Sequence, residues 1–578
     1  MRKSLIFAAL LGAATMTAGC DMKADISDDS ATGADDGTEW GGFVDGYLSG
    51  YFPLHPTFAV YQGRHEFDGQ LPDWSEAGLN AQIEYLKSSI ADARAIDPKT
   101  LTDEQLFERN YLIAVAEGEL FWLEDADQPH HNPAFYTGAL DPSPYITRPY
   151  ADAETRMRAF IKYAGNVPAA VGQIKANLKT PLDPALIQYG INAFNGYGEF
   201  FVGDAKAAFA EVKDSALQAE FDNVSSAASK AMKELAAWLE SEKANAKPGY
   251  ALGADRFARM LQKTEMVDIP LDELEAIGRA DLKRNQEAMK AACAKYAPGA
   301  SIPDCVAKMG SDKPEGGPVA EARRQLPELR AFLVAKDLVS IPGTEEALVE
   351  ESPPYNRQNS AYIDIPGPYE KGLPSVYYIS PPDPSWPEDV QRDFVPGKKD
   401  LLGTSVHEVW PGHFLNFLHA NRSDSMFGRL FVGYAFAEGW AHYTEEMMWD
   451  AGLNEGDPET HIGQLTNALL RDCRFLSAIG LHARGMTVDQ SRQMFRDECY
   501  IDEGNARQQA LRGTYDPAYL NYTMGKLMIR KLRADWTADK GGREAWKAFH
   551  DEFLSYGGPP IPLVRAAMMK EGSPRSVF

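Results

Sequence analysis

Residues 407–413 of the 578-residue chain read His-Glu-Val-Trp-Pro-Gly-His. This stretch decides where a helix must break and which side chains can come together. Its two histidines are six residues apart, so on a regular α-helix they would be separated by about 600°, or about 240° around the axis. Pro411 removes a backbone donor and clashes with the preceding turn, and Gly412 can adopt backbone angles that other residues avoid. We therefore predict that a helix breaks here and that the break swings His413 back beside His407.

The same residues form a variant of a known metal-binding pattern. In the motif His-Glu-x-x-His, two histidines one helical turn apart bind zinc, and the glutamate beside the first acts as general base. Once the break restores the geometry, His407 and His413 become zinc ligands and Glu408 becomes the base. A lone His-Glu pair is common in proteins without metal, so the prediction depends on accompanying residues.

A third ligand is expected because catalytic zinc commonly has three protein ligands and a water. Residues 437–445 (AEGWAHYTE) place Glu438, His442 and Glu445 on one face of a predicted helix. Glu438 lies 31 residues after His407, which allows a helix, a turn and a returning helix. We predict Glu438 as the third ligand, with His442 and Glu445 orienting the ligand rings by hydrogen bonds. The alternative is a solvated acidic helix face.

Hydrolysis of an amide also needs a donor for the negative charge that develops on the carbonyl oxygen. We predict Tyr522 in this role, with His482 as the second choice; the alternative for Tyr522 is a core tyrosine. Cleavage at a peptide C-terminus would further need a cation for the substrate carboxylate. Arg512 and Lys526 are candidates, although both could be ordinary charges on a helix surface.

Helical patterns dominate the rest of the chain, which predicts a mainly α-helical fold. Pro and Gly become dense between about 338 and 398, where the alternating runs 361–365 and 375–379 predict strands of one small β-sheet near the middle of the chain. The predicted helices cover 102–121 (capped by Thr102-x-x-Gln105), 152–245, 271–295, 318–336, 398–420, 428–450 and 460–484, with further helix starts at Thr487-x-x-Gln490 and Asp516-Pro517.

The N-terminus has the layout of a bacterial export signal. Arg2 and Lys3 precede an apolar run, residues 5–11, that is too short for a membrane span, and small residues lead to Cys20. This ending resembles a lipobox, so we predict a lipoprotein signal peptide over 1–20 and a lipid on Cys20. The alternative is an ordinary signal cleaved nearby.

The remaining chain is expected to form three regions. Residues 21–38 are predicted as a flexible acidic tether, 39–340 as a helical N-terminal region and 341–578 as the zinc-binding catalytic region. We expect the last two to pack as one unit. The predicted location is the cell envelope, facing the periplasm, with membrane contact only through the lipid anchor in the inner or outer membrane.

Charge and cysteine usage narrow the classes of function further. The net charge of −25 argues against nucleic-acid binding, which requires a basic surface. The four cysteines after Cys20 invite two local disulfides in an exported protein, the alternative being free buried thiols. The expected pairs are Cys293–Cys305 and Cys473–Cys499.

Several separated motifs together resemble the large bacterial family named domain of unknown function 885. They are residues 53–63 (PLHPTFAVYQG), the histidine segment 407–413, 438–445, Gly480-Leu481-His482, and 516–526. The resemblance covers most of the chain after residue 38. It implies a fold similar to neurolysin-like and carboxypeptidase-like zincins, with zinc at His407, His413 and Glu438 and with Glu408 as base.

The chain departs from that family pattern at two positions. Asn416 stands where the resemblance predicts Gln, and Gln509 stands where it predicts Glu. Either change could alter specificity. We predict a Zn²⁺-dependent metallohydrolase, most simply a peptidase on short peptides, with a carboxypeptidase as one form. The alternatives are a zinc amidase acting on a non-peptide amide and a non-catalytic, lipid-anchored binding protein.

Overall fold

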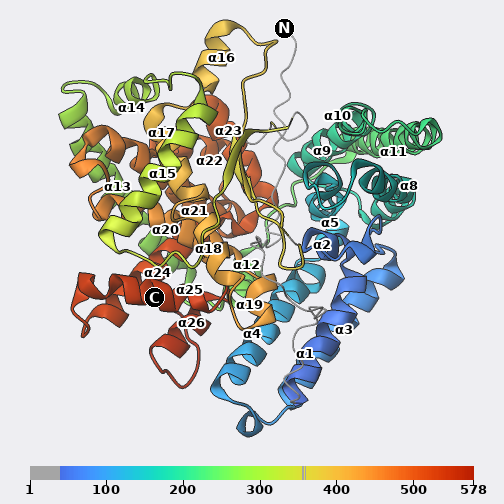
Figure 1. Ribbon diagram of the computed structural model, residues 1–578, viewed down its shortest axis with the longest axis horizontal. Coiled ribbons are helices and arrows are strands. Elements are labelled where there is room, and N and C mark those ends of the chain that lie inside the picture. The colour runs from blue at the N-terminus through green and yellow to red at the C-terminus, as the bar shows by residue number, and fades with distance from the viewer. Residues whose placement is uncertain (1–38, 354–356, 358–359, 371) are drawn as a thin grey trace. The chain divides into compact units, whose positions relative to one another are not determined.

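The computed structural model describes residues 39–353, 357, 360–370 and 372–578. The protein is mainly α-helical with one small sheet (Figure 1), which confirms the predicted fold class. The signal peptide, the lipid-bearing Cys20 and the acidic tether predicted for residues 1–38 lie outside the described residues. The chain divides into two compact units, residues up to Tyr250 with Pro366–Pro374, and Ala251–Ile365 with Ser375–Phe578. That the N-terminal and catalytic regions pack as one unit stays a prediction.

The first unit is built from helices that pack through aromatic side chains. Phe160, Phe201 and Phe221 are fully buried, and their rings join α8, α9 and α11. The predicted capping box of Thr102 and Gln105 is present at the start of α4. The helices are α1 Glu39–Leu54, α2 Pro56–Tyr61, α3 Glu76–Ala95, α4 Asp103–Leu120, α5 Gln128–His131, α6 Ala134–Thr137, α7 Ser143–Thr147, α8 Ala153–Asn177, α9 Pro184–Val202, α10 Asp204–Ala208 and α11 Ser215–Glu242.

A short return of the chain completes this unit. The backbone N–H of Tyr369 donates to the carbonyl of Gln62 over 3.0 Å. Gly63 has a φ of +94°, and a Cβ there would lie 2.5 Å from the backbone nitrogen of Glu370. The glycine is therefore required both by backbone conformation and by the close approach of the returning segment.

Helix α21 forms the core of the second unit. Every residue from Arg471 to His482 is buried, and the helix packs against α13, α17, α22, α23 and α24. The helices are α12 Ala254–Glu265, α13 Leu271–Tyr296, α14 Ile302–Gly310, α15 Pro318–Lys336, α16 Glu388–Phe394, α17 Lys398–Glu408, α18 His413–Ala420, α19 Met426–Leu430, α20 Tyr434–Asp450, α21 Pro458–Ala483, α22 Val488–Asp497, α23 Glu503–Tyr515, α24 Asn521–Thr537, α25 Trp546–Ser555 and α26 Ile561–Met568.

Two glycines allow α20 and α24 to approach closely. A Cβ on Gly439 would lie 2.5 Å from the Cα of Gly525, and a Cβ on Gly525 would lie 2.0 Å from the carbonyl oxygen of Ala435. Larger residues at either position would force the helix backbones apart. The contact places the start of α24, with Tyr522, beside the segment of α20 that carries Glu438.

The sheet has three strands in the order β1-β3-β2. β2 (Ala361–Asp364) and β3 (Val376–Ile379) are antiparallel and match the two predicted strands. β1 (Leu348–Glu351), which was not predicted, pairs in parallel with β3, with Leu348 opposite Val376.

Both local cysteine pairs are present as disulfides. Cys293–Cys305 joins α13 to α14, and Cys473–Cys499 joins α21 to the segment after α22. Each bond stabilises the fold mainly by restricting the unfolded chain, an effect that grows with the length of the closed loop.

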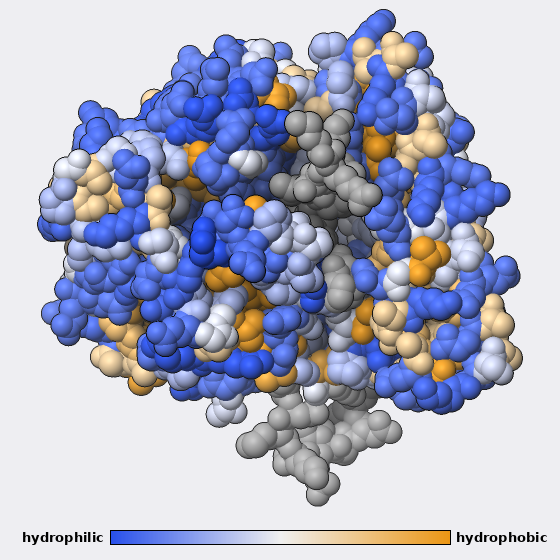
Figure 2. Space-filling model, turned by 90° about the horizontal axis from the view of Figure 1, so that it is seen from above, coloured by the Kyte–Doolittle hydropathy of each residue, from blue (hydrophilic) through white to orange (hydrophobic). Residues whose placement is uncertain are grey.

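The surface agrees with the acidic composition. Hydrophilic side chains predominate on the face shown in Figure 2, and hydrophobic side chains are scattered among them. Within the described residues, no helix has the combined length and apolar character that a membrane span requires.

A buried glutamate holds the starts of two helices together. Glu265, at the end of α12, is 3% exposed. Its Oε1 accepts hydrogen bonds from the Nδ2 of Asn521 at 2.7 Å and from the backbone N–H of Ala435 at 3.3 Å. Burial raises the pKa of Glu265 to about 8, although both hydrogen bonds lower it.

Because of this raised pKa, we predict that ionisation of Glu265 lowers the free energy of unfolding as pH rises. The folded-state pKa lies above the ordinary value, so the stabilising contribution is fully present below about pH 4.5 and is lost as pH rises through about 8. The loss is on the order of 4 kcal/mol over that range. Glu265→Gln should therefore be more stable than the wild type at pH 8.5 and nearly equal to it at pH 5, measured by denaturant unfolding. Glu287→Gln, at an exposed site on α13, should show no such pH-dependent difference.

Candidate metal centre

The predicted break divides the histidine segment between two helices. α17 ends at Glu408 and α18 begins at His413. Gly412, the residue before α18, has a φ of −73° and a ψ of −128°. Space also requires a glycine, because a Cβ on Gly412 would lie 1.7 Å from the carbonyl oxygen of His407. The chain folds back on the end of α17, and only a glycine fits there.

Helix α20 fixes this turn from the side. The Trp440 Nε1–H donates to the carbonyl of Pro411 over 2.8 Å, and Trp440 is fully buried. The peptide bond between Trp410 and Pro411 is cis. Trp440 lies two residues after Glu438 on the same helix, so the contact that holds the turn also places the third predicted ligand.

Three side-chain atoms converge at this point. The Oε2 of Glu438 lies 3.3 Å from the Nε2 of His407 and 3.4 Å from the Nε2 of His413. The two imidazole rings are 4.8 Å apart and almost perpendicular. One ligand atom from each residue lies within 4.8 Å of the others, and no other set of three His, Cys, Asp or Glu residues does so in the described parts of the chain.

The cluster fits a tetrahedral cation. Zinc bonds of 2.0–2.1 Å at tetrahedral angles place neighbouring ligand atoms roughly 3.3 Å apart, close to both contacts of Glu438. The Oε2 of Glu438 is buried without a hydrogen bond of good geometry, so the structure leaves this acceptor for another partner. Burial raises the pKa of Glu438, but the charge of His413 and the close contacts with both histidines outweigh it and hold the pKa well below its ordinary value. The carboxylate is therefore charged.

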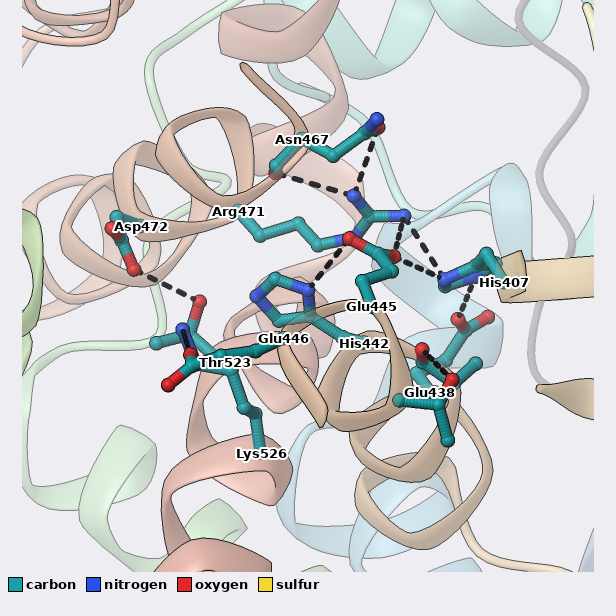
Figure 3. Close-up of polar contacts among 12 residues, drawn as sticks. His407, Glu438, His442, Glu445, Glu446, Asn467, Arg471, Asp472, Thr523 and Lys526 are labelled. Carbon is teal, nitrogen blue, oxygen red and sulfur yellow. Dashed lines mark hydrogen bonds and ion pairs between the residues drawn. The ribbon is translucent and has the colours of Figure 1, made fainter. Parts of the chain in front are cut away.

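A second carboxylate fixes one of the rings (Figure 3). The Nδ1–H of His407 donates to the Oε1 of Glu445 over 2.7 Å. This bond places a proton on Nδ1, so Nε2, which faces Glu438, is the atom that would bind a metal. Arg471 on α21 lies 3.3 Å from the same Glu445 oxygen and donates to the backbone and side chain of Asn467. Burial raises the pKa of Glu445, and Arg471 and His442 lower it well below its ordinary value.

Glu408 stands beside the cluster without a partner of its own. It makes no hydrogen bond or ion pair with any residue that the structure describes. Burial raises its pKa above the ordinary value, while the nearby His407 and His413 lower it. A carboxylate whose pKa is raised, and which forms no hydrogen bond or ion pair, can accept a proton and release it again.

Tyr522 lies near the site, among three arginines. Its ring is 6.5 Å from the ring of His407 and nearly parallel to it. The guanidinium carbons of Arg471, Arg474 and Arg512 lie 5.5, 4.8 and 5.8 Å from the ring centre. The Tyr522 hydroxyl donates to no acceptor among the described residues. Burial and Glu438 raise its pKa, so it carries its proton at neutral pH.

With this geometry established, comparison with known proteins gives the family. The family described as "Bacterial protein of unknown function (DUF885)" matches residues 56–568. The chain belongs to this family. No curated protein matches it at a significant level.

Two solved structures of similar fold support the architecture of this DUF885 protein. A predicted lipoprotein of unknown function from Shewanella oneidensis is 24% identical, with a TM-score of 0.77 over 92% of this chain and 100% of that one. A predicted lipoprotein from Colwellia psychrerythraea is 16% identical, with a TM-score of 0.78 over 92% of this chain and 98% of that one. At these identities the likeness shows the fold alone.

Two other predicted residues of this DUF885 protein lie in the core. His442 is fully buried, and its Nδ1 lies 3.3 Å from Glu445 Oε2, which suits the predicted orienting role, while its Nε2 has no hydrogen bond among the described residues. His482 is also buried, with its Nε2 bonded to the carbonyl of Gly513 and its Nδ1 facing the backbone N–H of Leu252. His482, the second choice of oxyanion donor, therefore already uses both ring nitrogens in hydrogen bonds within the core.

The two predicted substrate cations also have partners. Lys526 is fully buried, with its Nζ 2.5 Å from Asp281 Oδ2, so it neutralises a core carboxylate and is not available at the surface of the site. Arg512 donates twice to Asp516 and once to Tyr434, so its charge is largely compensated.

Arg471 and Arg474, which border the site from α21, were not predicted from the sequence. One signal was present. Residues 468–481 (ALLRDCRFLSAIGL) form an otherwise apolar helical stretch that contains three charges, and charges in such a stretch require buried partners. Of the two departures from the family pattern, Gln509 contacts Arg474. Asn416 is fully buried, and its amide has no hydrogen bond among the described residues.

The lack of space at Gly412 predicts a large effect of a single methyl group. Gly412→Ala must displace either the turn or the end of α17, and we expect a loss on the order of 3 kcal/mol in the free energy of unfolding. Gly165→Ala on α8, where a Cβ meets nothing within 4 Å, is the control and should be neutral or stabilising. Urea unfolding of both variants checks the prediction, and equal stabilities would contradict it.

Proposed function

We propose that this protein is a zinc-dependent hydrolase, most simply a peptidase that cleaves short peptides. One observation carries the proposal: the Nε2 atoms of His407 and His413 and the Oε2 of Glu438 converge at ligand spacing, with the unpaired Glu408 beside them. The likeness to predicted lipoproteins and the lipobox-like sequence at Cys20 support a location in the cell envelope.

His407, His413 and Glu438 would hold the metal, and Glu445 would keep the His407 ring in the required tautomer. A bound zinc ion supplies Lewis acidity, which polarises a substrate carbonyl and lowers the pKa of water toward about 7. The other steps use the protein's own residues.

Glu408 and Tyr522 divide the proton transfer and the charge stabilisation between them. Glu408 takes a proton from water as the water oxygen bonds to the carbonyl carbon. The carbon–nitrogen bond then breaks, and Glu408 returns the proton to the leaving amine, so the products are a carboxylate and an amine. The Tyr522 hydroxyl, which has no acceptor of its own, donates to the carbonyl oxygen as negative charge develops there.

Loss of the base should separate turnover from metal binding. Glu408→Gln keeps the size of the side chain but cannot accept the proton, so kcat should fall by about 10² to 10⁴-fold. The purified variant should still contain about one zinc ion per chain, whereas His413→Ala should lose it. Metal analysis and peptide cleavage followed by mass spectrometry, with and without a chelator, measure both quantities.

Three outcomes would contradict the proposal in different ways. Full activity of Glu408→Gln excludes Glu408 as the base. Absence of zinc even after zinc addition would favour a non-catalytic binding protein. Chelator-sensitive cleavage of non-peptide amides, with no cleavage of peptides, would favour an amidase. Glu388→Gln, an exposed change on α16, should match the wild type in both measurements.

The Glu445–His407 bond predicts a separate effect on metal affinity. Glu445→Gln removes the charge that orients and polarises His407, so zinc affinity should fall by about 10 to 100-fold. Competition against a fluorescent chelator measures this change directly. An unchanged affinity would mean that the carboxylate serves only to pair with Arg471.

A further inference from the structure

Arg474 differs from the other buried cations around the site because no carboxylate pairs with it. The residue is 8% exposed, and its Nε donates to the Oε1 of Gln509 over 2.8 Å. Neither Nη atom bonds to any acceptor in the described parts of the chain. Burial and the neighbouring Arg512 lower the pKa of Arg474, yet a guanidinium stays charged in proteins.

Its neighbours confirm that the positive charge is in excess. Arg471 lies against Glu445, and Arg512 is held by Asp516. Among the described residues, the one side chain that hydrogen-bonds to Arg474 is the uncharged amide of Gln509. Burying a charge without a counter-charge is costly, and buried charges are normally paired. An anion from outside the chain would supply the missing partner.

Gln509 is the reason why this charge is left over. A glutamate at position 509 would neutralise Arg474 through the same contact, whereas the glutamine amide carries no charge. The amide occupies the same volume, carries no charge and offers two further N–H donors. Replacement of one oxygen by nitrogen therefore changes a neutral pair into a cationic site.

Arg474 is also close enough to the candidate metal centre to act on the same substrate. Its guanidinium carbon lies 4.8 Å from the centre of the Tyr522 ring, and this ring lies 6.5 Å from that of His407. One extended residue spans roughly 3.5 Å. The guanidinium of Arg474 therefore lies at most about three extended residues from the ring of His407.

We propose that Arg474 and Gln509 bind the C-terminal carboxylate of the peptide substrate, so that the enzyme removes residues from the C-terminus. This inference rests on the proposed peptidase function. The two Nη groups form the planar fork that matches a carboxylate in bidentate fashion, and the Gln509 amide can add a third donor. Arg474 would then bind a charged C-terminal carboxylate more tightly than an uncharged C-terminal amide.

The test uses the zinc-loaded protein and one peptide sequence in four forms. The N-terminus is free or acetylated, and the C-terminus is a free acid or an amide. Acetylation should have no effect. Amidation should lower kcat/KM by about 30 to 100-fold, chiefly through KM, because a charge-assisted bidentate contact is lost.

Variants at position 509 then assign the effect to Arg474. Gln509→Glu should lower kcat/KM for the free acid by a similar factor and leave the amide unchanged, so that the preference disappears. Arg474→Gln should do the same and serves as the second variant. Gln508→Glu adds the same charge about 100° around α23 and should keep the preference. Thermal unfolding and zinc content show that each variant is folded and loaded.

Binding provides a readout that does not depend on turnover. Titration calorimetry of Glu408→Gln with the uncleaved free-acid peptide and with its amide should show the same preference for the acid, and adding Gln509→Glu should remove it. Chelator-sensitive cleavage that ignores amidation would overturn the Arg474 assignment and leave the peptidase proposal standing. No chelator-sensitive cleavage of any of the four peptides would overturn the peptidase proposal itself, and this inference with it.

Discussion

The close contact between Gly412 and the carbonyl of His407 is the constraint on which the site depends. Without a Cβ at position 412, the chain can fold back on the end of α17 and start α18 with His413 beside His407. Trp440 then ties the turn to α20 through the carbonyl of Pro411. Because Glu438 lies on that helix, one glycine and one indole position all three candidate ligands. The spacing that would separate the rings on a straight helix becomes the spacing that brings them together.

Charges on α21 organise the environment around these ligands. Arg471 compensates Glu445, the carboxylate that orients His407, so a negative group can be buried next to the site without raising its pKa. One turn further along the helix, the hydrogen-bonding partner of Arg474 among the described residues is the uncharged amide of Gln509. The site is therefore acidic where a cation would bind and basic on the side of Tyr522. This polarity suits a substrate whose carbonyl and terminal carboxylate lie at most about three residues apart.

The sequence was informative where local geometry decides the structure. The helix break, two capping boxes, two of three strands and the place of Glu438 on α20 all follow from spacing or from the chemistry of single residues. β1 escaped prediction because three of its four residues are exposed and it has no alternating pattern. Lys526 was misplaced for a different reason: its partner Asp281 is 245 residues away, and no local pattern reveals that contact.

Gln509 shows how a shared fold can leave the chemistry open. Chains of 16% and 24% identity adopt this architecture, because packing tolerates wide substitution. The charge balance around buried Arg474 is more sensitive to substitution, because it depends on the side chain at position 509. A glutamine in place of a glutamate preserves volume and hydrogen bonding to Arg474, so the backbone need not move, yet the net charge beside Tyr522 rises by one. Substrate preference within such a fold can therefore depend on whether one side-chain atom at position 509 is oxygen or nitrogen, a change that leaves the packing intact.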